Sequence, residues 1–462
     1  MADNNIEKQL SSAQEQALKA FQTGYGVSPD TQVDAGALRR EALDSEITTL
    51  TYDRKDLTLW KDLVQTTRPA ESTVQKYVVF DSYGEVGSSR FTPEIGLAPE
   101  NDPALRQKTV SMKFVSDTRR LSIASQVVTN IADPERVELN AGIVTVAKSI
   151  EWASFYGDAS LAPEGEEGYE FDGLATLIPE RNVMDLRGRD LEERDLNQAA
   201  TIIGTGYGQP TDAYMPIGVQ ASFNNNLLDR QRQLVRDNNG NVATGYAVTQ
   251  FFSARGLINL HGSTVMDLDN ILDENYVPRN GLAPQQAKVT ATVKTGQKGE
   301  FADVDLATHS YKVVVNSSSS KSLPSEEVTA VVANKDDGVE LKIQMTSLYQ
   351  NRPVSVSVYR KANDGVRQYY LLERISVSEA DEDGIITFVD KNQTIPGTAD
   401  VFVGELHPDV IHLFELLPMM RLDLAQVTSA KQFAVLWYGA LALRAPKRWV
   451  RIKNVGYLAS YR

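Results

Sequence analysis

Apolar residues recur at intervals of three and four between Asp133 and Gly157, a spacing that predicts one long helix. The apolar face comprises Ile143, Val146, Ala147, Ile150, Ala153 and Ser154. Asp133 is a favoured N-cap, Pro134 suits the first helical position, and Gly157 can end the helix. At about 1.5 Å per residue this helix would be roughly 35 Å long, so it needs tertiary packing to hold it. We expect a backbone helix across which other elements lie, and an ordinary long core helix is the alternative.

Two alternating stretches before this helix predict an extended hairpin. Residues 73–82 and 107–115 alternate apolar and polar positions, as strands do. The connection 84–103 is rich in glycine, proline and charge, so it cannot bury much by itself. A loop of this length is usually functional or disordered. Residues 1–70 contain helix-prone stretches but no compact unit, so we expect an arm that gains its stability by lying on another surface.

The stretch 160–280 mixes helical and strand patterns, which predicts an α/β or α+β unit. Helical spacing covers residues 191–204, which carry apolar side chains at intervals of three to five. Residues 212–219 form an apolar run typical of a buried strand, and a helix is expected to begin near Ala221.

Between residues 288 and 398 almost every segment alternates, which predicts seven short strands. The segments are 289–293, 311–315, 328–332, 339–345, 354–359, 369–372 and 385–389. Seven alternating strands in about 110 residues are typical of a sandwich of the immunoglobulin or fibronectin type III kind. Apolar strands resume at 431–443 and 449–457, and these must complete a sheet begun before residue 283. The sandwich is therefore predicted to be an insertion.

Composition narrows the classes of function. The chain has 462 residues, which suggests about three domains. Its formal net charge of −14 argues against a general nucleic-acid or membrane binder, although local basic patches remain compatible with it. The lack of cysteine excludes disulfides, thiol nucleophiles and thiolate metal sites. No apolar run approaches the ~20 residues of a membrane helix, and no signal peptide is visible. We expect a soluble intracellular protein with no membrane contact.

A search for catalytic or metal-binding patterns finds none that is convincing. His407 and His412 are five positions apart, which does not place two ligands on one helix face. The glycine-rich stretch 204–208 lacks the spacing of a phosphate-binding loop, and there is no G-x-S-x-G nucleophile elbow. The acidic stretch 164–172 lacks calcium-loop spacing, so we expect a solvated loop there. We therefore expect no cofactor, no metal and no enzymatic activity.

Two basic clusters are candidates for contact with an acidic partner. The first contains Arg230, Arg232 and Arg236, and the second contains Arg444, Lys447, Arg448, Arg451 and Lys453. If residues 447–453 form a strand, every second side chain from Lys447 to Lys453 shares a face that includes Trp449. Such a face could follow a phosphate backbone or pair with the acidic surface of a neighbouring copy. The net charge of −14 favours the contact between copies.

Five longer strings carry a family resemblance. They are DAGALRRE at 34–41, RQKTVSMK at 106–113 with Asp102-Pro before it, IEWASFYGD at 150–158, HGSTVM at 261–266 and FAVLWYGALALRAP at 433–446. These strings resemble the major capsid proteins of large contractile-tailed phages of Gram-positive bacteria, the Herelleviridae-type myophages. The resemblance runs from about residue 21 to residue 457, and strings of this length are far more specific than any short motif.

The resemblance implies an α+β fold of the tailed-phage, Hong Kong 97-type capsid kind. The implied units are an N-terminal arm (1–70), an extended loop (71–115), a peripheral domain (116–189) with a spine helix (134–157), an axial domain (190–282), an inserted all-β immunoglobulin/fibronectin III-like sandwich (283–399), the completion of the axial domain (400–430) and peripheral C-terminal strands (431–462). The implied function is structural: self-assembly into pentamers and hexamers of an icosahedral head around double-stranded DNA. Implied partners are further copies of the chain, portal and scaffold proteins during assembly, and the packaged DNA through non-specific contact. The product is a virion capsid assembled in the host bacterial cytoplasm.

The resemblance also bears on how neighbouring copies are locked together. One route in such families is a covalent Lys–Asn crosslink with the lysine on the extended loop, but residues 83–105 contain no lysine. We therefore predict a non-covalent lock that uses the arm, the loop and charge pairs. The predicted subunit-contact residues are Arg39, Arg40, Arg68, Arg90, Glu94, Arg106, Arg230, Arg232 and Arg236. Relatives can lose an N-terminal segment to a prohead protease, and Glu15 is the candidate cleavage position here.

A carbohydrate- or cell-surface-binding module is the alternative function. The sandwich strands and loops carry Tyr349, Tyr359, Tyr369 and Tyr370. Exposed tyrosines could stack on sugars, although core packing is the commoner role of tyrosine in a strand. The two functions are compatible, because a domain on the outer surface could decorate a shell.

Overall fold

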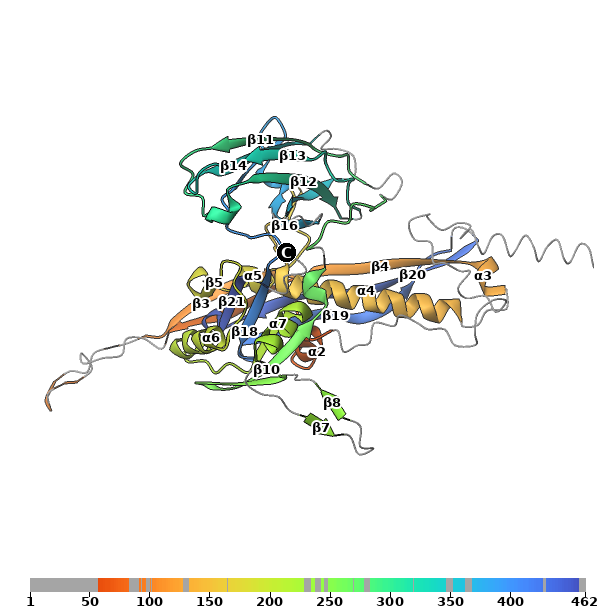
Figure 1. The fold of residues 1–462 in the computed structure, drawn as a ribbon. Helices are drawn as coiled ribbons and strands as arrows, with labels where there is room; N and C mark the ends of the chain where they lie inside the picture. Colours follow the sequence, from red (N-terminus) through yellow and green to blue (C-terminus); the bar gives the residue numbers. More distant parts are fainter. Residues whose placement is uncertain are drawn as a thin grey trace, which may run out of the picture.

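The computed structural model describes residues 57–82, 91–92, 94–96, 100, 102–127, 133–163, 165–227, 234–236, 242–244, 248–268, 270–277, 283–318, 320–345, 352–361, 368–426 and 429–456. A mixed α/β body carries an all-β unit above it, and two projections leave the body in opposite directions (Figure 1). Among the described residues, no helix combines the length and apolar character needed to cross a membrane.

The predicted long helix is confirmed as α4, Pro134–Tyr156. Its N-terminus is capped as expected, because the side chain of Asp133 accepts a hydrogen bond from the amide of Glu135. Gly157 follows the last turn, and its amide donates to the carbonyl of Ala153 at 2.8 Å. A Cβ atom at position 157 would lie only 2.2 Å from the carbonyl oxygen of Phe171, so close backbone packing requires glycine there.

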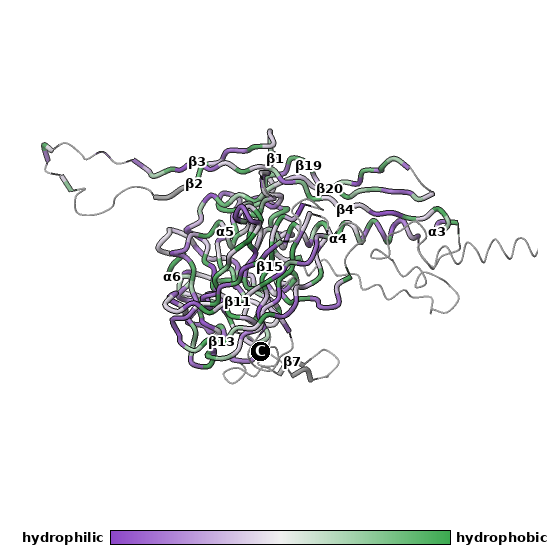
Figure 2. Tube along the Cα trace, turned by 90° about the horizontal axis from the view of Figure 1, so that it is seen from above, coloured by the Kyte–Doolittle hydropathy of each residue, from purple (hydrophilic) through white to green (hydrophobic). Residues whose placement is uncertain are grey.

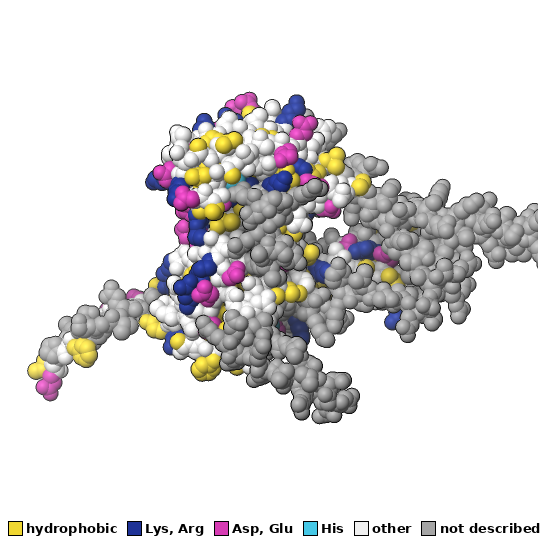
Figure 3. All heavy atoms as spheres, viewed as in Figure 1, with side chains coloured by type: hydrophobic (Ala, Val, Ile, Leu, Met, Phe, Trp, Pro, Cys, Tyr) yellow, Lys and Arg dark blue, Asp and Glu magenta, His cyan; other side chains and the backbone are white. Residues whose placement is uncertain are grey.

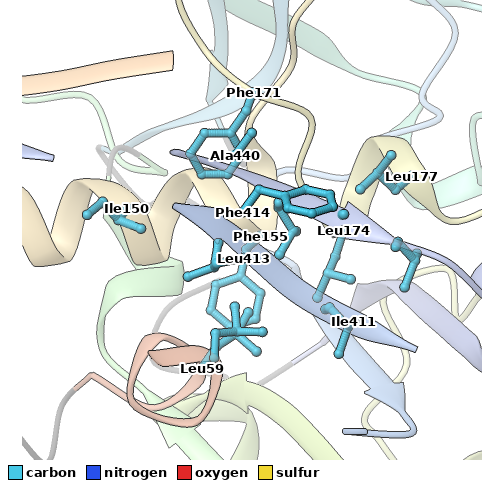
Figure 4. Packing of buried hydrophobic residues seen from close by; sticks show 14 of the residues in the cluster. Leu59, Ile150, Phe155, Phe171, Leu174, Leu177, Ile411, Leu413, Phe414 and Ala440 are labelled. Atoms are coloured by element: carbon cyan, nitrogen blue, oxygen red, sulfur yellow. The ribbon is translucent and has the colours of Figure 1, made fainter. Parts of the chain in front are cut away.

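A four-stranded sheet lies against α4. Its order is β1 (Arg68–Pro69), β19 (Ile411–Asp423), β20 (Ala430–Leu443) and β4 (Lys113–Ser122). Side chains from α4 and from this sheet form the first core, and Figure 4 shows Phe155 of α4 among Leu413 and Phe414 of β19. The helix is therefore a spine against which the long strands pack.

A second, six-stranded sheet has helices α6 (Glu193–Thr205) and α7 (Ile217–Leu227) on one face. Its order is β5 (Val183–Asp185), β21 (Trp449–Val455), β18 (Ala399–Gly404), β6 (Asp212–Pro216), β10 (Gly256–Ser263) and β9 (Gln250–Ser253). Strand β6 is buried on both faces, because Tyr214 points into the first core while Ala213 and Met215 point into the second. The two cores therefore meet at this strand.

The C-terminal strands are distributed differently from the implied domain boundaries. Residues 400–430 were expected to complete the unit formed by 190–282; β18 does so by pairing with β6, whereas β19 pairs with β20 in the sheet of α4. Residues 431–462 were expected to return to the unit of the spine helix; β20 does so by pairing with β4, whereas β21 pairs with β18 and β5 in the six-stranded sheet. The reason is local: β19 and β20 are consecutive and form one long antiparallel hairpin, so they share a sheet.

All seven strands predicted by alternation between 288 and 398 are present. They are β11 (Lys288–Lys294), β12 (Thr308–Ser317), β13 (Val328–Val331), β14 (Gly338–Gln344), β15 (Pro353–Lys361), β16 (Tyr369–Ser376) and β17 (Ile385–Asp390). They form one sheet of order β11-β14-β17 and another of order β13-β12-β15-β16. Constant-type immunoglobulin domains divide their strands differently, as ABED and CFG. The immunoglobulin or fibronectin kind therefore stays a prediction.

Short elements complete the described fold. They are α2 (Leu59–Val64), α3 (Ile123–Val127), α5 (Leu174–Leu177), the 3-10 helices η5 (Glu180–Asn182), η6 (Val265–Asp267), η7 (Asp303–Asp305), η8 (Val377–Glu379) and η9 (Pro446–Arg448), and the two-stranded pairs β2–β3 (Val74–Ser82, Ala104–Ser111) and β7–β8 (Leu234–Arg236, Val242–Thr244). The predicted hairpin is thus confirmed, because β2 and β3 pair antiparallel from Val74↔Ser111 to Ser82↔Ala104.

Candidate assembly surfaces

The hairpin β2–β3 projects away from the body. Seen from above, it extends to one side while β4, β20 and α4 extend to the other (Figure 2). Hydrophobic side chains lie at the outer end of this projection (Figure 3). There, Phe91 is 88% exposed and Ile95 is 99% exposed. A two-stranded sheet is marginal in water by itself, so this part of the chain is suited to packing against another surface.

The root of the same hairpin is anchored in the body. Tyr77, Val79 and Met112 are buried in the first core, and the ring of Tyr77 lies 6.4 Å from that of Phe414 on β19. Val78 points the other way and is exposed, as strand alternation requires. The hairpin therefore has one face on its own chain near the root and little cover beyond it.

The opposite projection is held together by an ion-pair cluster on its own chain. Glu135, near the start of α4, accepts from Arg421 of β19 at 2.6 Å and from Lys431 of β20 at 2.8 Å. Hydrogen bonds from Lys431 and Arg421 lower the pKa of Glu135. The guanidinium of Arg421 also lies over the ring of Phe433. This end is thus fixed within one chain, unlike the tip of the hairpin.

The sandwich is fixed to the body by Arg374 of β16. Its guanidinium donates to both oxygens of Glu170, at 2.9 and 3.1 Å, and to the carbonyl of Tyr156 at 2.8 Å. It also lies over the ring of Trp152, 4.5 Å from the ring centroid. Because Tyr156 ends α4, a cation here also interacts favourably with the C-terminal end of the helix.

Further contacts join the same two parts. The hydroxyl of Ser376 on β16 accepts from the amide of Ala162 and donates to the carbonyl of Ala162, both at 3.1 Å. Arg187 pairs with Glu300 at 2.9 Å. These bonds run across the boundary through backbone as well as side chains, so the sandwich is attached at several points rather than by its two linkers alone.

The acidic stretch 164–172 differs from the predicted solvated loop. Glu166 pairs with Arg352 and Glu170 with Arg374, both cations of the sandwich. The backbone of this stretch also takes part, since Lys113 donates to the carbonyl of Gly168. The stretch therefore lies between body and sandwich, and its charge serves the attachment.

The second basic cluster is largely neutralised within the chain. Arg448 pairs with Glu405 at 3.2 Å, Arg451 with Asp400 at 2.8 Å, and Lys453 lies 3.5 Å from Asp185. Lys447 and Arg448 belong to η9 rather than to strand β21, so strand alternation does not apply to them. Trp449 is 0% exposed, so the expected basic face with an aromatic residue is not formed.

Arg444 differs from the rest of this cluster. Its Nε atom is buried without a hydrogen-bond partner among the described residues. Burial and the nearby charge of Arg68 lower the pKa of Arg444. Arg68 itself donates to Asp409 at 2.9 Å and to the carbonyl of Pro408 at 3.1 Å. The structure thus brings together two predicted contact residues, one from each end of the sequence.

The other predicted contact residues are only partly described. Glu94 and Arg106 are exposed, Glu94 beyond the strands and Arg106 on β3. Arg236 belongs to β7, where the backbone alone is described. The remaining predicted residues, Arg39, Arg40, Arg90, Arg230, Arg232 and Glu15, lie outside the described residues.

The tyrosines expected to stack on sugars are not available for it. Tyr359, Tyr369 and Tyr370 are buried, and Tyr349 lies outside the described residues. Tyr359 and Tyr369 pack with Val314 and with Leu272, the latter from the segment that leads into the sandwich. The prediction of exposed tyrosines on these strands is therefore wrong, because this face of the sandwich is turned toward the body.

The described ranges contain no cluster of three or more histidine, aspartate or glutamate side chains that could hold a metal ion. His261 accepts or donates a hydrogen bond with Asp212 at 2.9 Å and stacks on Tyr214, with ring centroids 4.9 Å apart. Burial raises the pKa of Asp212, but hydrogen bonds from His261, Thr211 and Asn259 outweigh it and lower the pKa overall. These contacts tie β6 to β10.

Two charged residues of structural importance were not singled out from the sequence. Arg374 has no sequence signal, because its partners lie 204 and 218 positions away. Glu151 does have a sequence signal. It follows Ala147 by four positions and Ile150 by one, which places a carboxyl group at the edge of the apolar face of α4. A charge on a predicted buried face is a sign of a specific partner.

Comparison with known proteins identifies the family. The major capsid protein of Staphylococcus phage K is 59% identical over 464 aligned residues, covering 98% of this chain and 99% of that protein. A protein of Enterococcus phage phiEF24C is 55% identical and covers 99% of this chain and 98% of its own length. No protein-family model matches the chain.

Similarity to solved structures is much weaker in sequence. The capsid of a native GTA particle shares 9% identity over 92% of this chain and 98% of that chain, with a TM-score of 0.43. The encapsulin of the holo-SrpI complex from Synechococcus elongatus shares 10% identity over 90% of this chain and 95% of that chain, with a TM-score of 0.38. The full-length identity to the staphylococcal phage protein carries the assignment: this chain belongs to the major capsid proteins of bacteriophages.

Proposed function

We propose that the chain assembles into pentamers and hexamers of an icosahedral phage head that encloses double-stranded DNA. The observation that carries the proposal is the hairpin β2–β3, whose exposed apolar tip needs a second surface, in a chain whose relatives are capsid proteins. Further copies of the chain supply that surface. Portal and scaffold proteins take part during assembly in the host cytoplasm, and the packaged DNA makes non-specific contacts.

The described elements fit a capsid fold of the Hong Kong 97 type. The sheet of β1, β19, β20 and β4 with its spine α4 corresponds to a peripheral domain, and the six-stranded sheet with α6 and α7 corresponds to an axial domain. The hairpin β2–β3 is the extended loop that lies over the next subunit. The sandwich 283–399 stands on the outer surface of the shell as an immunoglobulin/fibronectin III-like insertion.

The lock between copies is non-covalent. Residues 83–105 contain no lysine for a crosslink. Glu94 and Arg106 are exposed on the projecting hairpin and are placed to pair with charges of a neighbour. Arg444 offers a second cationic point on the body, beside Arg68, whose guanidinium is paired with Asp409. In a chain of net charge −14, an acidic surface of another copy suits these cations.

The test is cryo-electron microscopy of the expressed protein with and without scaffold protein. Closed shells with pentameric and hexameric rings and a knob on each subunit are expected. The double variant Phe91→Asp with Ile95→Asp should prevent shells from forming while the unassembled chain keeps its melting temperature. Val304→Asp is the matched control, because Val304 is apolar and 82% exposed but lies on the sandwich. Shells of normal yield from the double variant would contradict the role of the hairpin.

A further inference from the structure

Glu151 of α4 is a carboxyl group enclosed within the protein. Its side chain is 0% exposed. One oxygen, Oε1, accepts hydrogen bonds from the amide of Thr58 at 3.1 Å, the hydroxyl of Thr58 at 3.1 Å and the hydroxyl of Ser263 at 3.2 Å. The other oxygen, Oε2, is buried without a partner among the described residues. The site thus provides hydrogen-bond donors for one oxygen of the carboxyl group but not for the other.

The partners of Glu151 define the start of a short helix. Thr58 is the N-cap of α2, yet its own side chain makes no capping bond. Glu151 supplies the acceptor instead, and a backbone hydrogen bond from Leu59 adds to that from Thr58. The amides at a helix start need such an acceptor, because they have no partner inside the helix. Glu151 therefore caps α2 from a different helix.

Helix α2 is the first helix in the described part of the chain, and it packs into the body. Leu59 and Leu63 are fully buried in the first core, and Figure 4 shows Leu59 pointing into the same cluster as Phe155 of α4. The hydroxyl of Tyr214 on β6 donates to Asp62 at 2.9 Å. Two buried polar contacts, from Glu151 and from Tyr214, thus hold this six-residue helix in place.

The charged groups around Tyr214, Glu151 among them, are mostly acidic. Asp62 lies on α2, Asp212 lies on β6, and both raise the pKa of Tyr214, which burial already raises. Glu151 contributes to the same shift. On β10, His261 is engaged by Asp212.

No lysine or arginine forms an ion pair with Glu151 in the described part of the chain. Lys61 of α2 is exposed, and η6 contributes another acid, Asp267. Burial is the largest cause that raises the pKa of Glu151 to about 7, and hydrogen bonds from Thr58 and Ser263 only partly offset it. An ionised carboxylate here would be fully enclosed, would have no cation beside it among the described residues, and would leave Oε2 without a donor.

We propose that Glu151 is a proton-dependent latch for helix α2. With a proton on Glu151, α2 is held against α4. Loss of the proton places an unpaired charge in the core and favours release of α2, which exposes Glu151 to water. The device is built from this chain alone, so it does not depend on the proposed assembly.

The direction of the pH dependence follows from the two states. The latched state holds the proton with a pKa of about 7, whereas a released, solvated glutamate has its ordinary pKa of about 4.5. Between these values the released state has lost its proton and the latched state has not. The equilibrium constant for opening should therefore rise about tenfold per pH unit from pH 5 to pH 7, and should level off above pH 7.

Hydrogen–deuterium exchange of the unassembled full-length chain tests this between pH 5 and pH 8. After correction for intrinsic exchange, the opening constant for amides 58–64 should rise with the slope above. Glu151→Gln keeps the acceptor for Thr58 and should abolish the slope. Glu135→Gln, the same change near the start of the same helix, should leave it unchanged. A flat profile in the unsubstituted chain, or an unaltered slope in Glu151→Gln, would overturn the proposal.

A second variant covers the case in which Glu151→Gln does not fold. Ser263→Ala leaves the acid in place but removes one donor to Oε1. Because that hydrogen bond lowers the pKa of Glu151, its loss should move the levelling-off point to higher pH. An unchanged profile in this variant would also count against the latch. Failure of shell formation with an intact slope would instead refute only the proposed function.

Discussion

The sandwich and the hairpin β2–β3 both leave the body, but they differ in what stabilises them. The sandwich has its own core, in which Val313, Val339 and Val358 are fully buried, and it is bonded to the body at several points. The hairpin is buried only at its root and carries nearly fully exposed apolar side chains at its tip. The difference separates a unit that is complete within one chain from a segment whose apolar tip its own chain leaves exposed.

The largest loss of stability is expected from removing the buried ion pair inside the sandwich. Arg360 is 2% exposed and pairs with Asp390, which also accepts from Tyr311. Arg360→Ala would leave the carboxylate of Asp390 buried without its cation, which costs about 3–5 kcal/mol. Calorimetry should show a lower melting temperature for the sandwich. Exchange protection of the hairpin root should be unchanged, and its loss would mean that the two parts are not independent.

Low pH should reduce the stability of the packing beneath the hairpin root. His412 is fully buried, its ring lies 4.7 Å from that of Phe414, and Phe414 contacts Tyr77 of the root. Burial and the charges of Arg444 and Arg68 lower the pKa of His412 to about 4. The unfolded chain binds a proton near pH 6.5 and the folded chain does not, so stability falls as pH drops from about 6.5 to 4.

The free energy of unfolding should be about 3 kcal/mol lower at pH 4 than above pH 6.5. Urea unfolding at several pH values measures it. His412→Phe should remove this part of the pH dependence, because phenylalanine keeps a buried aromatic ring beside Phe414 but cannot bind a proton. The exposed His407 provides the control, His407→Gln, which should keep the dependence. An identical slope in His412→Phe would contradict the assignment.

A moderate effect is expected where the sandwich meets the body. Arg374→Ala removes the bonds to Glu170 and Tyr156 and the contact with Trp152, a loss of about 1.5–3 kcal/mol. The sandwich should stay folded but become less ordered relative to the shell in cryo-electron microscopy. Arg374→Lys keeps the charge but not the paired geometry, so an intermediate result is expected. An equally ordered sandwich in Arg374→Ala would show that the backbone bonds suffice.

The smallest effect on the isolated chain is expected on the outer face of the hairpin. Val78 is exposed, so Val78→Thr should change the free energy of unfolding of the unassembled chain by less than about 0.5 kcal/mol. Its assembly should nevertheless be weakened, because a hydroxyl would be buried if a neighbour covers this face. Titration of assembly yield against protein concentration measures this. Equal yields would mean that the face stays in water.

Local patterns in the sequence predicted local structure well. The cap at Asp133, the end of the helix at Gly157 and the seven strands between 288 and 398 all depend on neighbours in the chain, and all are confirmed. Pairings over long distances were not predictable in this way. Nothing near Arg374 indicates Glu170, and the sheet that receives β21 is decided by β18 and β5 rather than by its own alternation.

The exposure of side chains was also not predictable from the sequence. Alternation tells which side chains of a strand share a face, but it does not tell what covers that face. Tyr359 and Tyr369 share a face that Leu272, from the segment leading into the sandwich, helps to cover. The acidic stretch around Glu166 and Glu170 has the composition of a solvated loop, yet its charges are used against cations of the sandwich. Both errors arise from an interface between two units of the same chain.

The order of the last four strands of the body has a mechanical consequence. The chain passes from β18 in the six-stranded sheet to β19 and β20 in the four-stranded sheet. It then returns to the six-stranded sheet as β21. A tensile load that pulls the two sheets apart is therefore borne by covalent bonds in two crossings, in addition to side-chain contacts. Because of these two crossings, the two sheets should resist separation as one mechanical unit.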